Sequence, residues 1–322
     1  MSFLHNLVKS FRDERAQRDK ARAIATEILN TYDELQSLDS LAPSPKVNEL
    51  LTNLVGLCAS SQDERVVNMT IQVLGSKPLR RVLVELRDMC STAEFHLESH
   101  WSKRIHNREE ACDSSGVWEP DAWDRLRAFP YFNNYEELVR IELAAIYNVL
   151  HTPPAKIAYI GSGPLPLTSF CLLQALTEGP NPWGTKRATE ILNIDRSADA
   201  VATSKALAQD LGLVEKGMQF TVSDADDEIL DLRGFPVVCL AALVGSTQGE
   251  KEELLCSIAS RMDVGALLVT RSAWGLRKCL YPELHITDRM LEHLEVCLVL
   301  HPHGNVINSV IVARVKPRAK SG

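Results

Sequence analysis

The chain has 322 residues and a formal net charge of −7, from 35 Lys and Arg residues against 42 Asp and Glu residues. Hydrophobic residues make up 45% and charged residues 24%, values that argue against a disordered, collagenous or coiled-coil chain. The acidic balance argues against a nucleic-acid-binding surface and a membrane-docking one, and the longest apolar stretch, residues 237–244, is too short to cross a membrane.

The eight cysteines form no Cys-x-x-Cys pair and no Cys/His cluster with the spacing of zinc ligands. Most of them lie in apolar runs, as Cys239 does. We therefore expect reduced core cysteines, a cytoplasmic protein and no bound metal. The first residues lack the apolar core of a signal peptide.

The first half of the chain shows the three-and-four spacing of apolar residues that indicates amphipathic helices. We expect helices over residues 21–38, 47–58, 66–74, 79–97 and 135–150. Asn134 is the expected cap of the last helix. The polar segment 107–124 is expected to be a surface excursion with one short helix. No convincing strand pattern appears before Pro153, which forms a boundary with Pro154.

After this boundary, short apolar strands alternate with helices. The strands are expected over residues 156–160, 191–194, 220–222, 237–243 and 266–270, followed by an antiparallel pair over 293–300 and 306–315. This alternation predicts an α/β fold with a mainly parallel sheet covered by helices on both faces. We expect an all-helical N-terminal domain over residues 1–152 and a Rossmann-like, doubly wound domain over 153–322.

The first expected strand ends in a glycine turn, in which Gly161 and Gly163 let the backbone turn sharply and approach a ligand. The third glycine of the dinucleotide fingerprint is absent, which weakens the case for a ligand that contains pyrophosphate. S-adenosylmethionine, which has no phosphate, is the alternative. Asp195 and Asp224 follow the next two strands, where they could hold the ribose hydroxyls and the adenine amino group. A structural turn with two solvated aspartates remains the other interpretation.

Seven short motifs extend this pattern along the chain. They are LAPSPKVN from residue 41, FPYFNNY from 129, GSGPLPLTS from 161, LAALVG from 240 with Glu250 and Lys251, Arg271-Ser272 with Gly275, LYP from 280, and VINS from 306. Together they resemble the nicotianamine synthase family, in its plant and fungal branch, over about residues 20–315. The resemblance implies that three S-adenosylmethionine molecules are condensed into nicotianamine by aminocarboxypropyl transfer, that three methylthioadenosines leave, and that no metal is needed.

The resemblance and the glycine turn together indicate which residues bind S-adenosylmethionine. We expect these to be Gly161, Ser162, Gly163, Pro164, Asp195, Asp224, Ala225, Ala241, Leu243 and Arg271. Arg271 ends the fifth expected strand, where it could pair with a substrate carboxylate or form a structural ion pair.

An aminocarboxypropyl transfer requires a neutral amine, so a nearby group must accept a proton. Glu94 and Glu98 lie on one face of an expected helix that resembles the family's acceptor-side helix. We predict that Glu98 positions and deprotonates the attacking amine, with Glu94 as the weaker candidate. Tyr131 and Tyr135 are predicted to place hydroxyls and rings beside the amine and the sulfonium, or else to pack between the domains. Tyr281 is a further, weaker candidate.

Two features depart from the plant pattern. Trp274 stands where that pattern tends to carry His, and segment 107–124 looks longer than its plant equivalent. Both could reshape the acceptor cavity, so other products stay open. The alternatives are cyclisation of S-adenosylmethionine to azetidine-2-carboxylate, a single transfer to another amino acid, an ordinary methyltransferase, and a non-catalytic binding protein. The sequence does not indicate the oligomeric state.

Overall fold

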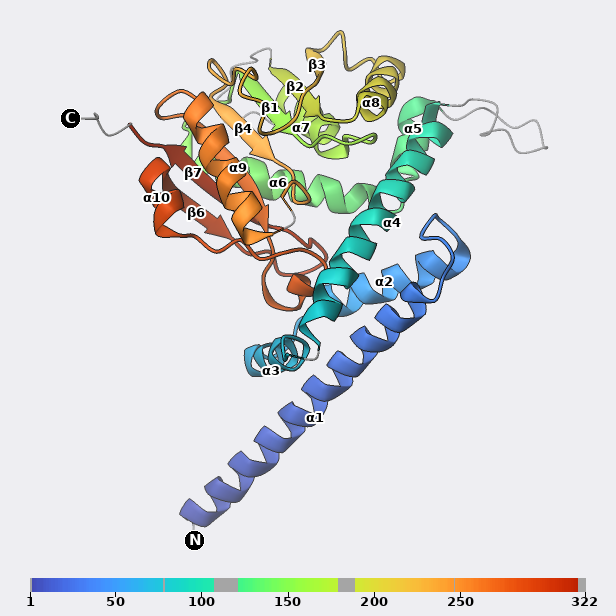
Figure 1. Ribbon diagram of the computed structural model, residues 1–322, viewed down its shortest axis with the longest axis vertical. Helices are drawn as coiled ribbons and strands as arrows, with labels where there is room; N and C mark the ends of the chain where they lie inside the picture. Colours follow the sequence, from blue (N-terminus) through green and yellow to red (C-terminus); the bar gives the residue numbers. More distant parts are fainter. Residues whose placement is uncertain (1, 78, 107–120, 179–188, 246, 318–322) are drawn as a thin grey trace.

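The computed structural model describes residues 2–77, 79–106, 121–178, 189–245 and 247–317. In these ranges the chain before the first strand is helical, as predicted. The helices are α1 (Ser2–Gln36), α2 (Pro45–Ala59), α3 (Glu64–Leu74), α4 (Arg80–His106), α5 (Ala122–Arg127) and α6 (Phe132–Val149). The N-terminal end of α1 projects away from the rest of the molecule (Figure 1). None of the helices described is both long and apolar enough to span a membrane.

Local capping explains where several of these helices begin. Ser44 accepts a hydrogen bond from the Val47 amide, and Pro45 occupies the first turn of α2, where no amide is needed. The prediction that Asn134 caps α6 is wrong. The cap position belongs to Tyr131, because the helix starts from a turn in which the Phe132 amide donates to the carbonyl of Phe129. Asn134 instead donates its side-chain amide to the carbonyl of Asn305.

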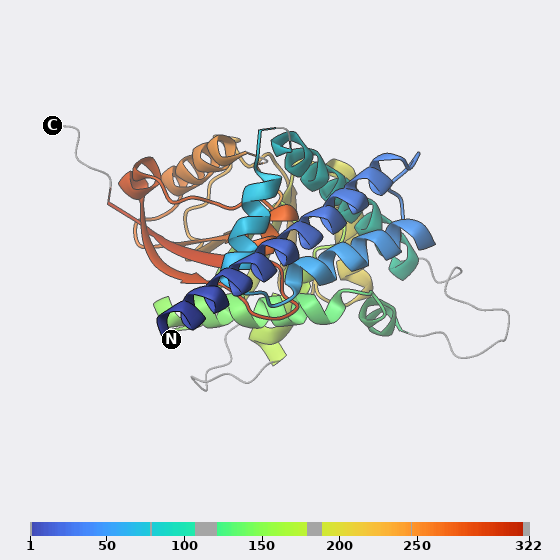
Figure 2. The same ribbon diagram turned by 90° about the horizontal axis from the view of Figure 1, so that it is seen from below.

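Helices α1 to α4 share a core with a segment from the far end of the chain. This segment is the 3-10 helix η2 (Gly275–Cys279), which contacts α2, α3 and α4 and whose Leu276 and Cys279 are buried in the shared core. Figure 2, the view from below, shows α1 and α2 side by side in front of the rest of the molecule. The helical part is therefore held to the sheet by packed apolar side chains as well as by the chain itself.

The second half of the described chain forms a seven-stranded sheet. Its strands are β1 (Lys156–Ile160), β2 (Glu190–Asp195), β3 (Met218–Val222), β4 (Val237–Leu240), β5 (Leu267–Ser272), β6 (Leu294–Leu300) and β7 (Ser309–Val315). Their order is β3-β2-β1-β4-β5-β7-β6, with β1 to β5 parallel and β7 antiparallel to both neighbours. The predicted fold class and closing antiparallel pair are confirmed. β7 begins later than expected, because the carbonyl of Val306 accepts a hydrogen bond from Arg277 instead of pairing in the sheet.

Helices cover both faces of this sheet. α6, α7 (Leu167–Glu178) and α8 (Ala198–Asp210) pack on one face, where Ile146 and Phe170 are fully buried. α9 (Gln248–Arg261) and α10 (Asp288–His293) pack on the other, where Leu255 and Ile258 are fully buried. α6 precedes Pro153 yet packs on the sheet, so the division of the chain at that residue stays a prediction.

Candidate active site

A cavity of about 830 Å³ lies where the helical part meets the carboxyl ends of β1, β2, β4 and β5. Its walls come from α2, α4, the start of α6 and the loops that follow these four strands. The carboxyl ends of parallel strands are the usual ligand-bearing edge of a doubly wound sheet. The volume falls in the range of pockets that enclose a small molecule.

The glycine turn after β1 forms the floor of this cavity. Gly161 and Gly163 have φ angles of +78° and +68°, a region that favours glycine. The Gly163 amide donates to Oδ2 of Asp195 at 2.8 Å, and the Ser197 amide donates to Oδ1 at 2.9 Å. A side chain at Gly161 would collide with Val244 in the loop after β4. The two loops thus approach each other closely, and Asp195 is oriented by the turn.

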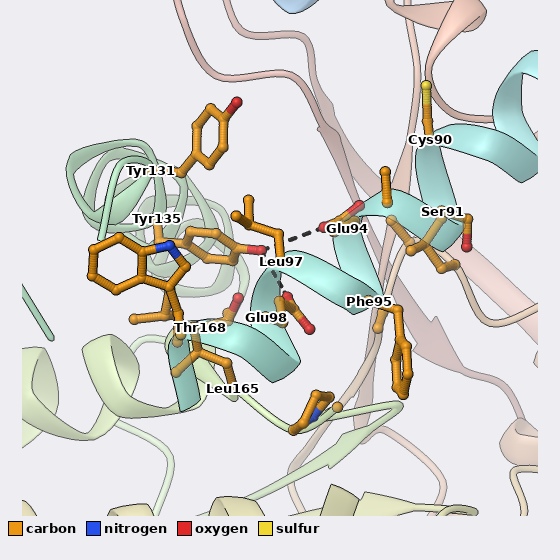
Figure 3. A pocket seen from close by; sticks show the side chains of 18 of the residues that line it. Cys90, Ser91, Glu94, Phe95, Leu97, Glu98, Tyr131, Tyr135, Leu165 and Thr168 are labelled. Carbon is orange, nitrogen blue, oxygen red and sulfur yellow. Dashed lines mark hydrogen bonds between the residues drawn. The ribbon is translucent and has the colours of Figure 1, made fainter. Parts of the chain in front are cut away.

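Two carboxylates on α4, Glu94 and Glu98, meet the phenol of Tyr135 (Figure 3), and Glu94 also meets the phenol of Tyr281. Oη of Tyr135 lies 3.3 Å from Oε1 of Glu98 and 3.5 Å from Oε1 of Glu94. Tyr281 donates to the other oxygen of Glu94 at 2.7 Å. The other oxygen of Glu98, Oε2, would be only 3.1 Å from a Cβ on Gly163. Glu98 therefore lies between Tyr135 and the glycine turn.

Burial changes the proton affinities of these groups. It raises the pKa of Glu98 well above the usual carboxyl range, and the nearby charge of Glu94 raises it further. Burial also raises the pKa of Glu94, although the hydrogen bond from Tyr281 and the charge of Arg271 oppose the rise. The phenol pKa values of Tyr135 and Tyr281 are raised by burial and by the carboxylates, so both remain hydrogen-bond donors. A carboxylate with a raised pKa is suited to take a proton from an amine.

Arg271 lies in the cavity wall but is held by protein groups. Its Nε donates to Oε1 of Glu142 at 2.8 Å, and its Nη2 donates to Oγ1 of Thr168 at 2.8 Å. The guanidinium lies 5.9 Å from the ring centre of Tyr159. The structure therefore shows the structural ion pair that the sequence left open. Contact of Arg271 with a substrate carboxylate stays a prediction.

Most of the predicted site residues line this one cavity. They are Glu98, Tyr131, Tyr135, Gly161, Ser162, Gly163, Pro164, Asp195, Ala241, Leu243 and Arg271. The ring of Tyr131 points away from the two carboxylates (Figure 3), so Tyr135 is the phenol in position for proton chemistry.

Asp224 and Ala225 lie outside the cavity lining. Asp224 is exposed and accepts a hydrogen bond from the amide of Ala225, which is itself buried. They follow β3, which lies beyond β2 in the sheet and is therefore farther from the glycine turn. Their contact with adenine stays a prediction.

The structure adds residues that sequence reasoning did not assign. Glu142 lies on the apolar stripe of α6 with Leu138, Val139 and Ile146, and a carboxylate on a buried stripe is a signal for a buried partner. Asn308 is a second added residue: it lines the cavity, as the predicted Ser162 does, and Nδ2 of Asn308 and Oγ of Ser162 are both buried without a hydrogen-bond partner among the described residues. Such atoms are suited to receive polar groups of a ligand.

Lys251 is also buried, and its Nζ donates to the carbonyl of Ala242 at 2.8 Å. Burial lowers the pKa of this lysine to about 8. The bond holds the loop after β4, which forms one wall of the cavity.

The two departures from the plant pattern have different outcomes. Trp274 stacks on His301 with ring centres 5.4 Å apart and meets His303 edge-on at 5.6 Å. Trp274 is not among the described residues that line the cavity. Its position therefore does not support the expectation that it reshapes the cavity. Of segment 107–124, residues 107–120 lie outside the described part of the chain, while Asp121 caps α5. Among the described residues, no group of three or more His, Cys, Asp or Glu side chains could hold a metal.

The strand order, the antiparallel β7, the glycine turn and the carboxylate at the end of β2 define a Rossmann-like domain of the S-adenosylmethionine-dependent transferase type. A family model described as nicotianamine synthase protein matches residues 16–320. The chain belongs to the nicotianamine synthase family.

Individual relatives agree with this assignment. Nicotianamine synthase 3 of Oryza sativa subsp. indica is 36% identical over 286 residues, which cover 88% of this chain and 75% of the relative. Nicotianamine synthase of Solanum lycopersicum is 35% identical over 296 residues, covering 91% and 84%. Among solved structures, MtNAS in complex with MTA and tNA has a TM-score of 0.69 at 21% identity and covers 93% of this chain and 98% of that chain. This last similarity supports the fold.

Proposed function

We propose that this chain condenses three S-adenosylmethionine molecules into nicotianamine and releases three methylthioadenosines. In each step an amine nitrogen bonds to the methylene carbon beside the sulfonium, and the bond from that carbon to sulfur breaks. The electron pair stays on sulfur as a neutral thioether, and the proton of the attacking ammonium passes to the protein. Two such steps link units, and the third closes a four-membered azetidine ring.

The position of Glu98 carries this proposal. Its carboxylate lies against Gly163, at the turn expected to hold the donor, and bonds to Tyr135. It is thus placed to remove the proton from an amine that approaches the donor. Rigid placement contributes further, because displacement at carbon needs the nucleophile and the leaving sulfur to be nearly in line.

The substrates also carry α-carboxylates, which need hydrogen-bond donors inside the cavity. Nδ2 of Asn308 and Oγ of Ser162 are buried donors that face it, and Arg271 supplies a positive charge in the wall. We expect these groups to receive the carboxylates when the substrates displace water. Asp195, already fixed by the glycine turn, is expected to hold the ribose hydroxyls of the donor.

One experiment separates this function from its alternatives. Purified protein is incubated with S-adenosylmethionine alone, and the products are identified by mass spectrometry. Nicotianamine with methylthioadenosine supports the proposal, whereas azetidine-2-carboxylate as the end product would assign a cyclase. S-adenosylhomocysteine formed only with an added acceptor would assign a methyltransferase. Glu98→Gln should abolish turnover and preserve donor binding measured by calorimetry, and unchanged turnover would overturn the role of Glu98.

We also propose that the protein works in the cytoplasm. Cys58, Cys171, Cys239 and Cys279 are buried free thiols, as expected in a reducing compartment. Imaging of a fluorescent fusion in the source cells tests this, and a signal confined to an oxidising compartment would overturn it.

A further inference from the structure

Glu94 and Glu98 form a pair that depends on one shared proton donor. Both carboxylates face Oη of Tyr135, which carries a single hydrogen and can donate it to only one of them at a time. Glu94 has a second phenol, Tyr281, and its charge is further favoured by Arg271. Glu98 instead extends its second oxygen to the glycine turn. The two carboxylates therefore differ in their partners, although both are half-buried in the same cavity wall.

Their spacing matches the chemistry of a growing aminocarboxypropyl chain. Residues four apart on a helix have Cβ atoms about 5–6 Å apart, and Glu94 and Glu98 stand in this relation on α4. Each transfer adds a unit in which three carbons separate the alkylated nitrogen from the next free amine. With ordinary bond lengths and angles, two such nitrogens lie roughly 5 Å apart when the chain is extended. The distance between Glu94 and Glu98 along α4 is therefore about the length of one aminocarboxypropyl unit of the product.

The cavity also continues past this pair. α4 contributes to the lining from Cys90 to Arg104, and α2 adds Asn48 and Thr52. A stretch of 15 helical residues extends about 21 Å, so the cavity follows α4 for several turns. A chain held at Glu98 and Glu94 thus has room to extend along the helix, away from the glycine turn.

We propose that Glu94 and Glu98 act as a two-position ruler, in which Glu94 holds the amine alkylated in one transfer while Glu98 deprotonates the amine that attacks in the next. This inference rests on the proposed synthase function. After the first of the two linking transfers the newly added primary amine takes the place at Glu98, and the alkylated ammonium moves one turn to Glu94. Glu94 is a positioning residue: it fixes how far the intermediate moves and forms no bond to the reacting carbon.

The test compares products by the number of aminocarboxypropyl units they contain. Wild type, Glu94→Gln and Tyr281→Phe are each incubated with S-adenosylmethionine. Mass spectrometry then gives the ratio of nicotianamine to the product of one transfer, with methylthioadenosine as the count of total transfers. We expect this ratio to fall at least tenfold in Glu94→Gln, and to fall less in Tyr281→Phe, which keeps the carboxylate and removes one donor.

Glu85→Gln is the matched control. Glu85 is also on α4 and also bonds a tyrosine, Tyr32, but it is not among the residues that line the cavity. Its product ratio should equal that of wild type. An unchanged product ratio in Glu94→Gln, whatever its overall turnover rate, would overturn the ruler. If Glu94→Gln does not fold, an unchanged product ratio in Tyr281→Phe would overturn it instead. Failure of the wild type to form nicotianamine would instead refute the proposed function itself.

Discussion

The buried ion pair between Arg271 and Glu142 gives a prediction about stability. The two side chains are 8% and 2% exposed, and their atoms Nε and Oε1 are 2.8 Å apart. Glu142→Gln keeps the shape and an acceptor oxygen but leaves the buried guanidinium without a compensating charge. Breaking a buried pair in this way costs about 3–5 kcal/mol of unfolding free energy. With an unfolding entropy of about 2.1 cal/mol/K per residue over 322 residues, Tm should fall by roughly 4–7 °C.

Thermal unfolding of Glu142→Gln measures this fall in Tm, and a double-mutant cycle measures the coupling between the two charged side chains. Urea unfolding followed by tryptophan fluorescence gives the free energies of wild type, Glu142→Met, Arg271→Met and the double variant. We expect each single variant to lose stability and the double variant to recover most of the loss, because two apolar side chains can fill the site without an unpaired charge. Additive losses, or a single-variant loss below about 1 kcal/mol, would refute the idea that the pair is desolvated.

Two further predictions concern Glu98 and its neighbour in the turn. Because burial raises the pKa of Glu98, the folded protein keeps a proton that the unfolded chain releases, so stability falls as pH rises from the ordinary carboxyl pKa of 4.5 towards the raised value. Glu98→Gln lacks this decline, so its stability relative to wild type should increase as the pH of the urea melts rises above 4.5, whereas parallel pH profiles would contradict the shift. Gly163→Ala should cost about 1–2 kcal/mol through its left-handed backbone. It should also lower turnover at least about tenfold by displacing the Glu98 carboxylate. Gly212→Ala is its control, with a φ of +64° and nothing within 4 Å of the added Cβ, and equal turnover losses in both would contradict the reasoning.

The parts of the fold that local chemistry determines could be predicted from the sequence. Strand β1 and its turn follow from an apolar run that ends in Gly161 and Gly163, and those residues need no distant partner to define the bend. The pairing of Glu94 and Glu98 on one helix face is likewise a matter of spacing. Both predictions place residues in the cavity that the structure shows.

Contacts between distant segments could not be predicted in this way. Arg271 and Glu142 are 129 positions apart, and Tyr281 and Glu94 are 187 positions apart. Periodicity identifies which face of a helix is buried, but it does not identify what covers that face. Tyr281 therefore remained a weak candidate, and the partner of Arg271 was left open between a substrate and a protein group.

The size of the cavity has a consequence for how the proposed reaction depends on concentration. One molecule confined to 830 Å³ is present at about 2 M, whereas a released intermediate at about 1 µM would be roughly a million times more dilute. An intermediate that stays beside the glycine turn therefore meets each new donor far more often than one that must return from solution. The length of the product then depends on how slowly the cavity releases its contents compared with the arrival of the next donor.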